Sequence, residues 1–457
     1  MKKAYFILVC SLCFSSFVYG QTITEVINQM DLDSLQLTLR EFSGEQTTIV
    51  NGNEVTISSR VQSNNELAAD YLFQKLDKLD HLNVVNQFIN GEAGRRNIIA
   101  TQLGKTNPDN IYIICAHYDS VAAYCADDNA SGTATVLEIA RILSTQCLDN
   151  TIVYALWDEE EIGLVGAGYY ANQAAANNDN ILGVLNIDMM GYDGNNDNNF
   201  DIDVRDVANS LEMKDDLISI LNTPEYGFSL QVNVVNPGTS ASDHSRFWNQ
   251  GYSAVLVGES WETDDETPYY HSSGDTYNTL NFPYYHALSK LIMGYMVTKA
   301  GLVNVTNSVS QSGNVLTALQ NGASYQWINI DTGTAILGET NQSFTPVMNG
   351  SYAVEITLGS CIETSNSFDF NSLSLETFKN TEIAFYPNPV KTNLVIENIG
   401  SFEELEIELY DINGKLILQE SAIKIKTTLN LSALSNGVYF LKIKTNNKLQ
   451  LSKIIKD

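Results

Sequence analysis

Positively charged residues are scarce in this sequence. Its 457 residues include 25 lysines and arginines against 54 aspartates and glutamates, so the formal net charge is −29 at pH 7. Proteins that bind nucleic acid or an anionic membrane surface need clustered positive side chains. The composition therefore argues against both kinds of partner. A hydrophobic content of 44% with 10% aromatic residues is typical of a globular protein.

Long hydrophobic runs are also missing after the first 20 residues. No later segment reaches the roughly 20 apolar residues of a membrane-spanning helix, so no stable membrane span is predicted. Residues 1–20 place Lys2 and Lys3 before a short apolar run that ends in small residues. This pattern is typical of a secretory signal peptide, and the processed chain is expected to begin at Gln21.

Cysteine is sparse as well, with six residues in all. Cys10 and Cys13 fall inside the predicted signal peptide, and neither lies in a convincing lipobox. The other four would reach an oxidising compartment, where one disulfide is plausible. The sequence leaves the pairing open among Cys115, Cys125, Cys147 and Cys361.

Helix and strand patterns alternate from Gln21 to Leu302. Near-continuous apolar strands are expected at residues 96–104, 110–117, 151–157, 181–190 and 252–258. Helices are expected at residues 22–42, 63–82, 131–144, from about 161 and at 284–300. This alternation predicts an α/β fold, with a mixed, largely parallel sheet flanked by helices on both faces.

Two small all-β modules are predicted after residue 302. Residues 303–372 alternate apolar and polar positions, as a β-sandwich does. Residues 376–457 again show short strands and turns, with ten acidic and ten basic residues, so the whole net charge of −29 belongs to the preceding part of the chain. The predicted division is a signal peptide (1–20), an α/β domain (21–302), a sandwich (303–372) and a C-terminal domain (376–457).

Histidines and carboxylates gather where the predicted parallel strands end. Ligand-binding groups of open α/β sheets lie at these carboxyl ends. Buried carboxylates are costly without a cation, and mixed nitrogen and oxygen ligands suit zinc above all. The pattern therefore predicts a zinc site, with more than one ion. The candidate residues are His117, Asp119, Asp127, Asp128, Glu159, Glu160, Glu161, Asp188 and His271.

Six short motifs carry a family resemblance. In chain order they are AHYDS, ADDNASGTA, EEEIGLVGAGYY, NIDMMGYD, SDHSRFW and YYHSSGDT. Together they resemble co-catalytic di-zinc exopeptidases of the bacterial leucyl aminopeptidase type (clan MH), over about residues 63–300. The resemblance implies the zinc exopeptidase fold and two Zn²⁺ per chain.

The resemblance also implies a set of metal ligands. Asp128 would bridge the two zinc ions. His117 and Asp188 would complete one zinc site, and Glu161 and His271 the other. A shared carboxylate of this kind is what two ions a few ångströms apart require.

Further roles follow for residues beside the ligands. Glu160 would be the general base for a water that bridges the metals. Asp119 would orient the His117 ring without itself binding the metal. Tyr270 stands where several members of the family place a tyrosine that stabilises the oxyanion, although a structural tyrosine is almost as good an interpretation. Glu159 has no role in the family and is expected to be solvated or to cap a helix.

The resemblance has one further implication and one gap. It implies a cis peptide bond between Asp128 and Asn129. Some relatives carry an arginine shortly before the SDH motif that helps to fix the substrate, whereas GTSASDH has none. How this chain would anchor the peptide terminus is therefore open.

Two other patterns are weaker. Asp243 and His244 lie among serines, but GTSASDH is not the nucleophile elbow of a serine hydrolase. Residues 193–203 place oxygen-bearing side chains at alternate positions like a calcium loop, but Asn198 stands where the glycine should be. A solvated turn is the preferred interpretation of this segment, with calcium binding left open.

The C-terminal residues carry a second resemblance. YPNP, LYDINGK and GVYFLKI resemble the type A sorting domain of the type IX secretion system, over about residues 377–457. With the signal peptide, this implies export across both membranes of a Gram-negative cell, to the surface or the medium, with the type IX machinery as a partner. The preceding sandwich resembles Ig-like spacer modules. Whether the C-terminal domain is cleaved or anchored stays open, as does the oligomeric state.

The predicted function is a secreted zinc aminopeptidase that hydrolyses the N-terminal bond of peptides. The alternatives are a glutaminyl cyclase or a carboxypeptidase on the same scaffold, or a catalytically inactive surface-binding protein. Cyclases keep a single zinc with fewer ligands, and an inactive protein has no need of Glu160. The preferred N-terminal residue cannot be read from fold and metal site alone.

Overall fold

The protein is described by a computed structural model that covers residues 21–61, 64–261, 263, 265–358, 361–371, 382–400, 402–422, 425–445 and 448–457. The predicted signal peptide lies outside these residues. In the described part, no helix is long and apolar enough to cross a membrane. The chain divides into two compact units, and the first contains the residues up to Ser308 together with Leu319–Tyr325 and Val354–Ser365. The domain boundaries expected from the sequence stay predictions.

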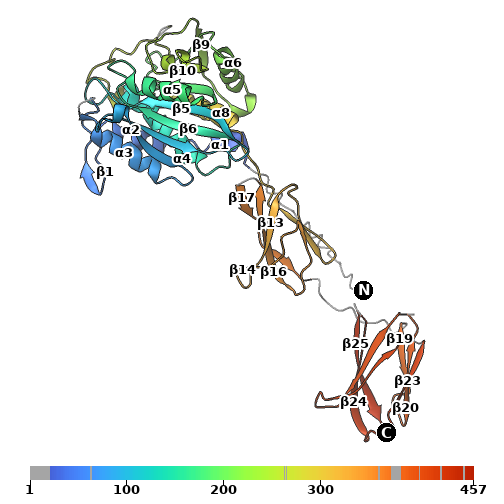
Figure 1. Cartoon of the computed structure of the whole chain (residues 1–457). Coiled ribbons are helices and arrows are strands. Elements are labelled where there is room, and N and C mark those ends of the chain that lie inside the picture. The colour runs from blue at the N-terminus through green and yellow to red at the C-terminus, as the bar shows by residue number, and fades with distance from the viewer. Residues whose placement is uncertain are drawn as a thin grey trace, which may run out of the picture. The chain divides into compact units, whose positions relative to one another are not determined.

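The first unit is built on one eight-stranded sheet of order β3-β4-β6-β5-β7-β10-β8-β9 (Figure 1). The central strands β6, β5, β7 and β10 run parallel, whereas β3, β4 and β8 join their inner neighbours antiparallel. The α/β class and the mixed sheet are thus confirmed. The strands are β3 (Asn83–Phe88), β4 (Arg96–Gln102), β5 (Asn107–His117), β6 (Asn150–Trp157), β7 (Ile181–Ile187), β8 (Asn199–Asp203), β9 (Gln231–Val235) and β10 (Ala254–Glu259).

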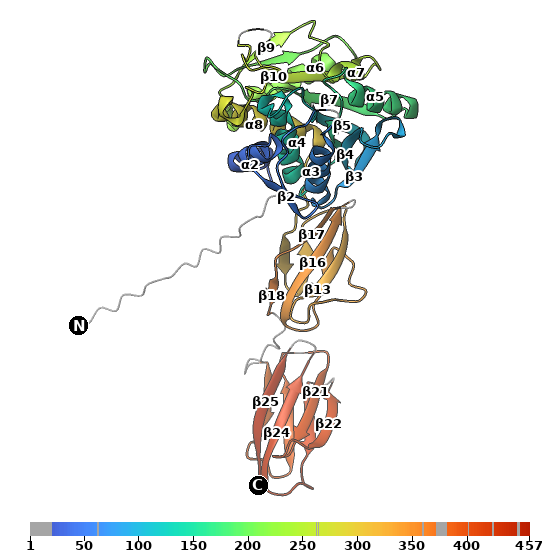
Figure 2. The same ribbon diagram turned by 90° about the vertical axis from the view of Figure 1, so that its left-hand side faces the viewer.

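Helices cover both faces of this sheet (Figures 1 and 2). The larger core packs one face against α1 (Ile23–Ile27), α2 (Leu32–Phe42), α3 (Glu66–Asp77), α4 (Gly132–Leu143), α6 (Ser210–Leu221) and α8 (Phe282–Ala300). The smaller core packs the other face against α5 (Val165–Asn177) and α7 (His244–Trp248). Shorter elements are β1 (Thr48–Val50), β2 (Asn53–Val55), η2 (Ile89–Gly91), η3 (Ala126–Ser131), η4 (Pro224–Tyr226) and η5 (Tyr277–Thr279).

The central strands are apolar on both faces because both faces are covered. Every residue from Thr151 to Trp157 of β6 is buried. Two helix predictions were wrong in detail. Residues 22–42 form two helices, since the Asp31 side chain accepts from the Asp33 N–H and starts α2 anew. The helix expected from about Glu161 begins only at Val165, after a turn.

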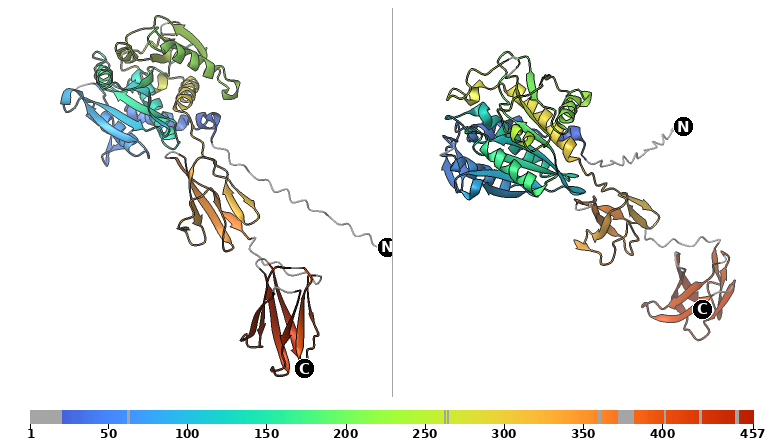
Figure 3. Two further views of the ribbon diagram at one scale, coloured as in Figure 1. Left: turned by 45° about the vertical axis from the view of Figure 1, so that its right-hand side comes forward. Right: turned by 45° about the horizontal axis from the view of Figure 1, so that its top comes forward.

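The described residues after Ser308 form small antiparallel sheets, four in number, and no helix is assigned among them. Figure 3 shows these strands in two further views. The strands before residue 372 are β11 (Val309–Ser312), β12 (Val315–Ala318), β13 (Ser324–Asn329), β14 (Thr334–Ala335), β15 (Ser343–Phe344), β16 (Gly350–Leu358), β17 (Cys361–Thr364) and β18 (Phe368–Phe370). The later strands surround their own apolar core. They are β19 (Ile383–Tyr386), β20 (Asn393–Asn398), β21 (Leu405–Tyr410), β22 (Leu416–Ala422), β23 (Lys426–Asn430), β24 (Gly437–Lys444) and β25 (Leu449–Lys456).

One disulfide joins Cys147 to Cys361, which are 214 residues apart in the sequence. Both residues belong to the first unit. Cys115 and Cys125 are free thiols buried in the same unit. The structure thereby answers the pairing that the sequence left open.

Candidate metal centre

Five of the predicted ligands meet at the carboxyl ends of the central strands. His117 is the last residue of β5, and Asp188 directly follows β7. Asp128 lies in η3, Glu161 in the turn after β6, and His271 in a later loop. Their potential ligand atoms form two groups, His117, Asp128 and Asp188 in one, and Asp128, Glu161 and His271 in the other.

The distances within each group match the ligands of one zinc ion. His117 Nε2 lies 3.2 Å from Asp128 Oδ1 and 3.3 Å from Asp188 Oδ1. His271 Nε2 lies 3.4 Å from Asp128 Oδ2 and 3.2 Å from Glu161 Oε2. Ligand atoms about 2.0 Å from a tetrahedral ion lie roughly 3.3 Å from one another. Asp128 belongs to both groups and turns one oxygen towards each.

The donor set fits a cation. Among the five candidate ligands, three have a buried oxygen without a hydrogen-bond donor in the described part of the chain, namely Asp128 Oδ2, Glu161 Oε1 and Asp188 Oδ1. Burial, followed by the charge of Asp128, raises the pKa of Glu161. A bound cation would remove this cost, because it favours the ionised carboxylate. The two groups of ligand atoms therefore fit a bound cation such as zinc.

The segment that carries Asp128 is held by tertiary hydrogen bonds. The Asp128–Asn129 peptide bond is cis, as the family resemblance implies. The Asn129 side chain donates to the Ile187 carbonyl and accepts from the Gly132 N–H. The Asp275 carboxylate accepts from the backbone N–H groups of Asp127 and Asp128. Asp127 itself turns away from the two ligand groups and accepts from the Gly191 N–H.

Arg60 is a buried residue that the sequence did not point to. Its guanidinium donates to backbone carbonyls of the loop between β5 and α4 and of the end of α2. A single arginine in a polar stretch carries no signal for this role, because all its partners are distant in sequence. The acceptors are the carbonyl oxygens of Phe42, Tyr118, Tyr124, Cys125 and Asp128.

Asp119 supports both sides of the centre. Its Oδ1 lies 3.5 Å from His117 Nδ1, the contact expected of a residue that orients this histidine. The same carboxylate accepts from the backbone N–H groups of Glu160 and Glu161. It therefore also fixes the turn that presents these two side chains. The second contact was not anticipated.

The three consecutive glutamates point to different partners. Glu159 is 0% exposed and forms two contacts of 2.5 Å with the Arg95 guanidinium. The prediction that it is solvated or caps a helix was therefore wrong. The partner lies 64 residues earlier in the chain, so no local pattern could reveal it. Glu160 lies within the reach of His117 and Glu161, and burial raises its pKa.

Tyr270 lies beside the centre and is 43% exposed. Its ring stacks on the His271 ring, with centroids 3.7 Å apart, and packs against Trp261. Burial and the acidic residues nearby raise the pKa of Tyr270, so the phenol keeps its proton at neutral pH. It can therefore donate a hydrogen bond, and its role in stabilising an oxyanion stays a prediction.

The serine hydrolase pattern is not assembled. The His244 ring contacts the Thr239 carbonyl through Nε2, and burial lowers the pKa of His244 to about 3. The Ser242 hydroxyl donates to Asp188 instead. Asp243 is a buried carboxylate with no hydrogen-bond donor among the described residues.

The segment that resembles a calcium loop is part loop and part strand. Asp193 Oδ1 and Asp197 Oδ1 accept backbone N–H groups within the loop. Residues 199–203 form β8, which the sequence did not predict. The oxygens at the start of the segment thus serve the turn itself, and calcium binding stays untested.

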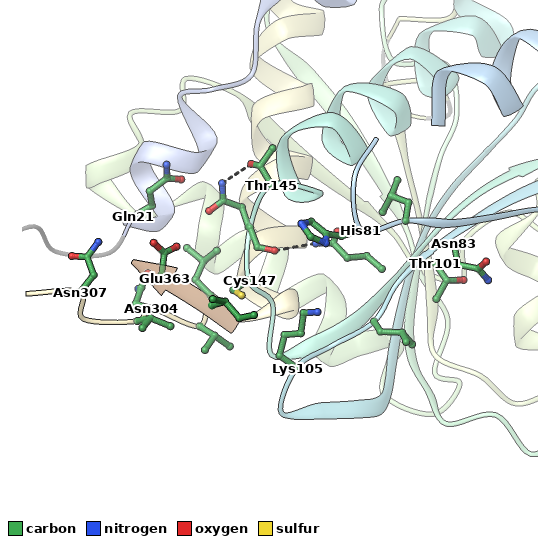
Figure 4. A pocket seen from close by; sticks show the side chains of 18 residues that line it. Gln21, His81, Asn83, Thr101, Lys105, Thr145, Cys147, Asn304, Asn307 and Glu363 are labelled. Carbon is green, nitrogen blue, oxygen red and sulfur yellow. Dashed lines mark hydrogen bonds between the residues drawn. The ribbon is translucent and has the colours of Figure 1, made fainter. Parts of the chain in front are cut away.

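Two cavities of the first unit differ in their relation to the centre. One of about 120 Å³ is lined by Asp188 and Tyr270 and so borders the centre. The other, of about 780 Å³, shares no lining residue with it and is lined by Gln21, His81 and Cys147, among others (Figure 4). Only the first can admit a group that also reaches the metal ligands.

Known proteins share the fold of this chain or part of its sequence. The LapA aminopeptidase of Legionella pneumophila has a similar fold, with a TM-score of 0.52 at 18% identity, over 62% of this chain and 75% of that chain. A "Probable leucine aminopeptidase" of Trichophyton verrucosum is 28% identical over 244 residues, 50% of this chain and 61% of the relative. A "Probable zinc metalloprotease" of Leptosphaeria maculans is 40% identical over 104 residues, 21% of this chain and 24% of the relative. The chain thus spans less than two thirds of either curated relative.

The first unit therefore has the fold of a solved aminopeptidase, with candidate zinc ligands at its strand ends. Residues 97–296 match peptidase family M28, and residues 384–457 match the secretion system C-terminal sorting domain. The chain carries a family M28 peptidase domain followed by a sorting domain. Both resemblances drawn from the motifs are confirmed.

Proposed function

We propose that this protein is an exported aminopeptidase that uses two zinc ions to hydrolyse the N-terminal bond of peptides. The observation that carries the proposal is the position of Asp128, whose two carboxylate oxygens each face a different histidine. One carboxylate between two sets of ligands is the arrangement that a pair of zinc ions requires. His117 and Asp188 would hold one ion, and Glu161 and His271 the other.

The residues around these ligands fit peptide hydrolysis. Zinc bound there supplies Lewis-acid chemistry, which polarises a carbonyl and lowers the pKa of water. The Glu160 carboxylate takes a proton from the attacking water and delivers it to the leaving nitrogen. The Tyr270 hydroxyl donates to the carbonyl oxygen as negative charge develops on it. Asp119 keeps His117 and the backbone of Glu160 in place.

The test compares metal content with activity. Protein stripped by a chelator should be inactive and should recover with zinc, with about two ions per chain. The recovered enzyme should hydrolyse leucine p-nitroanilide but not the N-acetylated form of the same substrate, because an aminopeptidase needs a free amino terminus. One zinc per chain with cyclisation of glutaminyl peptides would favour a cyclase. Cleavage of N-blocked peptides from the C-terminus would favour a carboxypeptidase, and full zinc occupancy without any turnover an inactive binding protein.

Export follows from the other end of the chain. The C-terminal domain matched by the sorting family would be recognised by the type IX secretion machinery after a signal peptide has directed the chain across the inner membrane. The protein would then act at the cell surface or in the medium. A chain that lacks residues 384–457 should not cross the outer membrane of the native host and should accumulate in the periplasm. Cell fractionation would show this.

A further inference from the structure

Two arginines line a third cavity of the first unit, in a protein whose net charge is −29. This space, the arginine cavity, has a volume of about 400 Å³. It is bordered by the end of β8, by α7 and by the loop between β9 and α7. Its described lining contains no carboxylate. The polar lining residues are Arg205, Ser240, Ser245, Arg246 and Asn249.

One loop contributes to this cavity and to the cavity beside the metal centre. Thr239, Ala241 and Ser242 line the cavity that also contains Asp188, whereas Ser240 lines the arginine cavity. Successive residues of the loop thus serve different cavities, and the two cavities share no lining residue. The arginine cavity is therefore separate from the proposed site of hydrolysis.

Arg205 is held in place without using its whole guanidinium group. Its Nε donates to the Gly238 carbonyl over 2.9 Å, and its guanidinium carbon lies 5.2 Å from the centroid of the Trp248 ring. These two contacts orient the group. No described residue accepts a hydrogen bond from either Nη atom of Arg205. Both terminal NH₂ groups are thus available to a ligand.

Arg246 presents a second guanidinium group from α7. One of its Nη atoms donates to the Gly163 carbonyl over 2.6 Å. The buried Nε has no acceptor among the described residues. Donor capacity of this side chain is therefore also left for an acceptor from outside the chain.

The charges of these two arginines are not neutralised in the lining. Three other arginines are paired with carboxylates, but no ion pair joins Arg205 or Arg246 to a described residue. Burial raises the pKa of Asp243 and the charge of Arg246 partly opposes this, but Asp243 does not line the cavity. Asp206, next to Arg205, is exposed and does not line it either.

We propose that the arginine cavity binds a tetrahedral oxyanion, a phosphate or sulfate group, through Arg205 and Arg246. The proposal does not depend on peptidase activity. Two guanidinium forks offer paired N–H donors that match the oxygens of such a group. The hydroxyl groups of Ser240 and Ser245 and the amide of Asn249 belong to the same lining and are neutral donors.

The cavity is larger than a single oxyanion. Its volume of about 400 Å³ equals that of roughly thirteen water molecules, at about 30 Å³ each. Leu164, Val207 and Trp248 add apolar surface to the lining. A phosphate or sulfate ester therefore fits as well as the free ion, with its anionic group at the arginines and its organic part along the apolar surface.

Calorimetric titration of the full-length protein tests the charge and shape of the ligand. Sodium sulfate, glycerol 3-phosphate and sodium acetate are compared at constant ionic strength, adjusted with sodium chloride. We expect sulfate to bind at least about tenfold more tightly than acetate, because one carboxylate cannot engage both guanidinium forks. Tighter binding of glycerol 3-phosphate than of sulfate would identify an ester as the ligand, and equal binding the free ion. No saturable binding of either, or equal binding of acetate, would overturn the proposal.

Substitutions of the arginines assign the anion to this cavity. Arg205→Gln and Arg246→Gln should each weaken sulfate binding at least about tenfold. Lys78→Gln is the control, because Lys78 is an exposed positive residue outside the lining, and the affinity for sulfate should not change. Unchanged affinity in both arginine variants, or an equal loss in the control, would place the anion elsewhere and contradict the proposal.

A substitution at Ser240 tests the site without removing either arginine. Ser240 is exposed, so Ser240→Glu should leave the fold intact while it adds a negative charge to the lining. Repulsion should then weaken sulfate binding at least about tenfold relative to Ser240→Gln, a neutral side chain of the same size. Thermal unfolding without sulfate checks that both variants are folded. Equal sulfate affinity of the two folded variants would overturn the proposal.

Discussion

Acidic side chains lie in opposite surroundings in the two units of this protein. In the C-terminal domain, Glu406 and Glu408 of β21 lie directly opposite Lys444 and Lys442 of β24 and form ion pairs of 2.8 and 2.7 Å with them. At the candidate metal centre, carboxylates are grouped with histidines and with one another. The first arrangement balances charge locally, and the second concentrates it.

The directions of the pKa shifts express the same difference. The hydrogen bond from Lys442 lowers the pKa of Glu408, so the ionised form is favoured. Burial raises the pKa of Glu160 and of Glu161, so the ionised form is penalised. A sheet surface with cross-strand pairs needs nothing further to be stable. The metal centre needs a cation that the chain itself does not provide.

The sharpest contrast between the two regions is expected from substitution of Glu160. Glu160→Gln should lower kcat by about 10²–10⁴-fold, because the general base is lost, while zinc stays bound. Glu406→Gln, the same change in the C-terminal domain, should leave kcat unaltered. Steady-state kinetics and metal analysis of the purified proteins check both statements. If Glu160→Gln loses its zinc, the roles of Glu160 and Glu161 have been exchanged.

Removing the shared carboxylate should affect metal binding more than any other single change. Asp128→Ala deletes the oxygens that face both histidines, so both ions should be lost together, at least about 10–100-fold in affinity. Metal content after dialysis against zinc buffers of known free concentration measures this loss. A variant that keeps two ions and normal activity would point to Asp127 as the bridge.

The independence of the catalytic part can be tested by truncation after Val303. Every proposed ligand and base precedes this residue, so the shortened protein should be soluble and active but should no longer leave the cell. The Cys147–Cys361 disulfide is lost with the truncation, and the shortened chain should therefore carry Cys147→Ser to avoid a stray thiol. Full-length Cys147→Ser is the control, with an expected loss of about 2–5 kcal/mol in stability. An insoluble shortened chain would show that residues beyond Val303 belong to the catalytic fold, and equal export of both lengths would contradict the sorting role.

Acid should weaken the metal-binding unit through His244. Its pKa is about 3 in the folded protein because it is buried, against about 6.5 in an unfolded chain. The unfolded state therefore takes up the proton first, and stability present above pH 6.5 is lost as the pH falls towards 3. Between pH 7 and pH 5 this residue should cost about 2 kcal/mol of unfolding free energy. Urea denaturation of wild type and His244→Gln at both pH values isolates the contribution, and parallel losses in the two proteins would exclude His244 as the source.

The smallest effect is expected where charges are paired on the surface. Glu406→Gln should change the stability of the C-terminal domain by about 0.2–1 kcal/mol, because Glu406 and Lys444 are both partly exposed to water. Thermal unfolding at low and high salt provides the measurement. A loss of several kcal/mol would mean that this surface pair matters as much as the buried groups, and the contrast between the regions would fail.

The sequence predicted the parts of the fold that depend on local composition. Residues 110–117 and 151–157 were identified as strands because they are apolar on both faces, and their ends correctly placed His117 and the acidic turn. The strand β8 was missed because Asp201 and Asp203 interrupt the apolar pattern. Those side chains face a cavity and not the core, which only the folded sheet reveals.

The site was predictable as far as its motifs reach. The candidate ligands lie close together as expected. The residues that position them have no recognisable pattern in the sequence. Arg60 bonds to carbonyl oxygens up to 68 residues away, and Arg95 pairs with Glu159 across 64 residues. A tertiary partner of this kind overrides the local expectation of an exposed glutamate.

The Cys147–Cys361 disulfide has a consequence for when the protein reaches its full stability. It closes a loop of more than 200 residues, and in the chain-entropy account such a closure raises stability by roughly 5 kcal/mol. Thiols stay reduced in a bacterial cytoplasm and oxidise only outside it. On the proposed export route, a newly made chain would therefore lack this restraint while it is threaded through a translocation channel. The disulfide would then form only after export, when the chain no longer has to be unfolded.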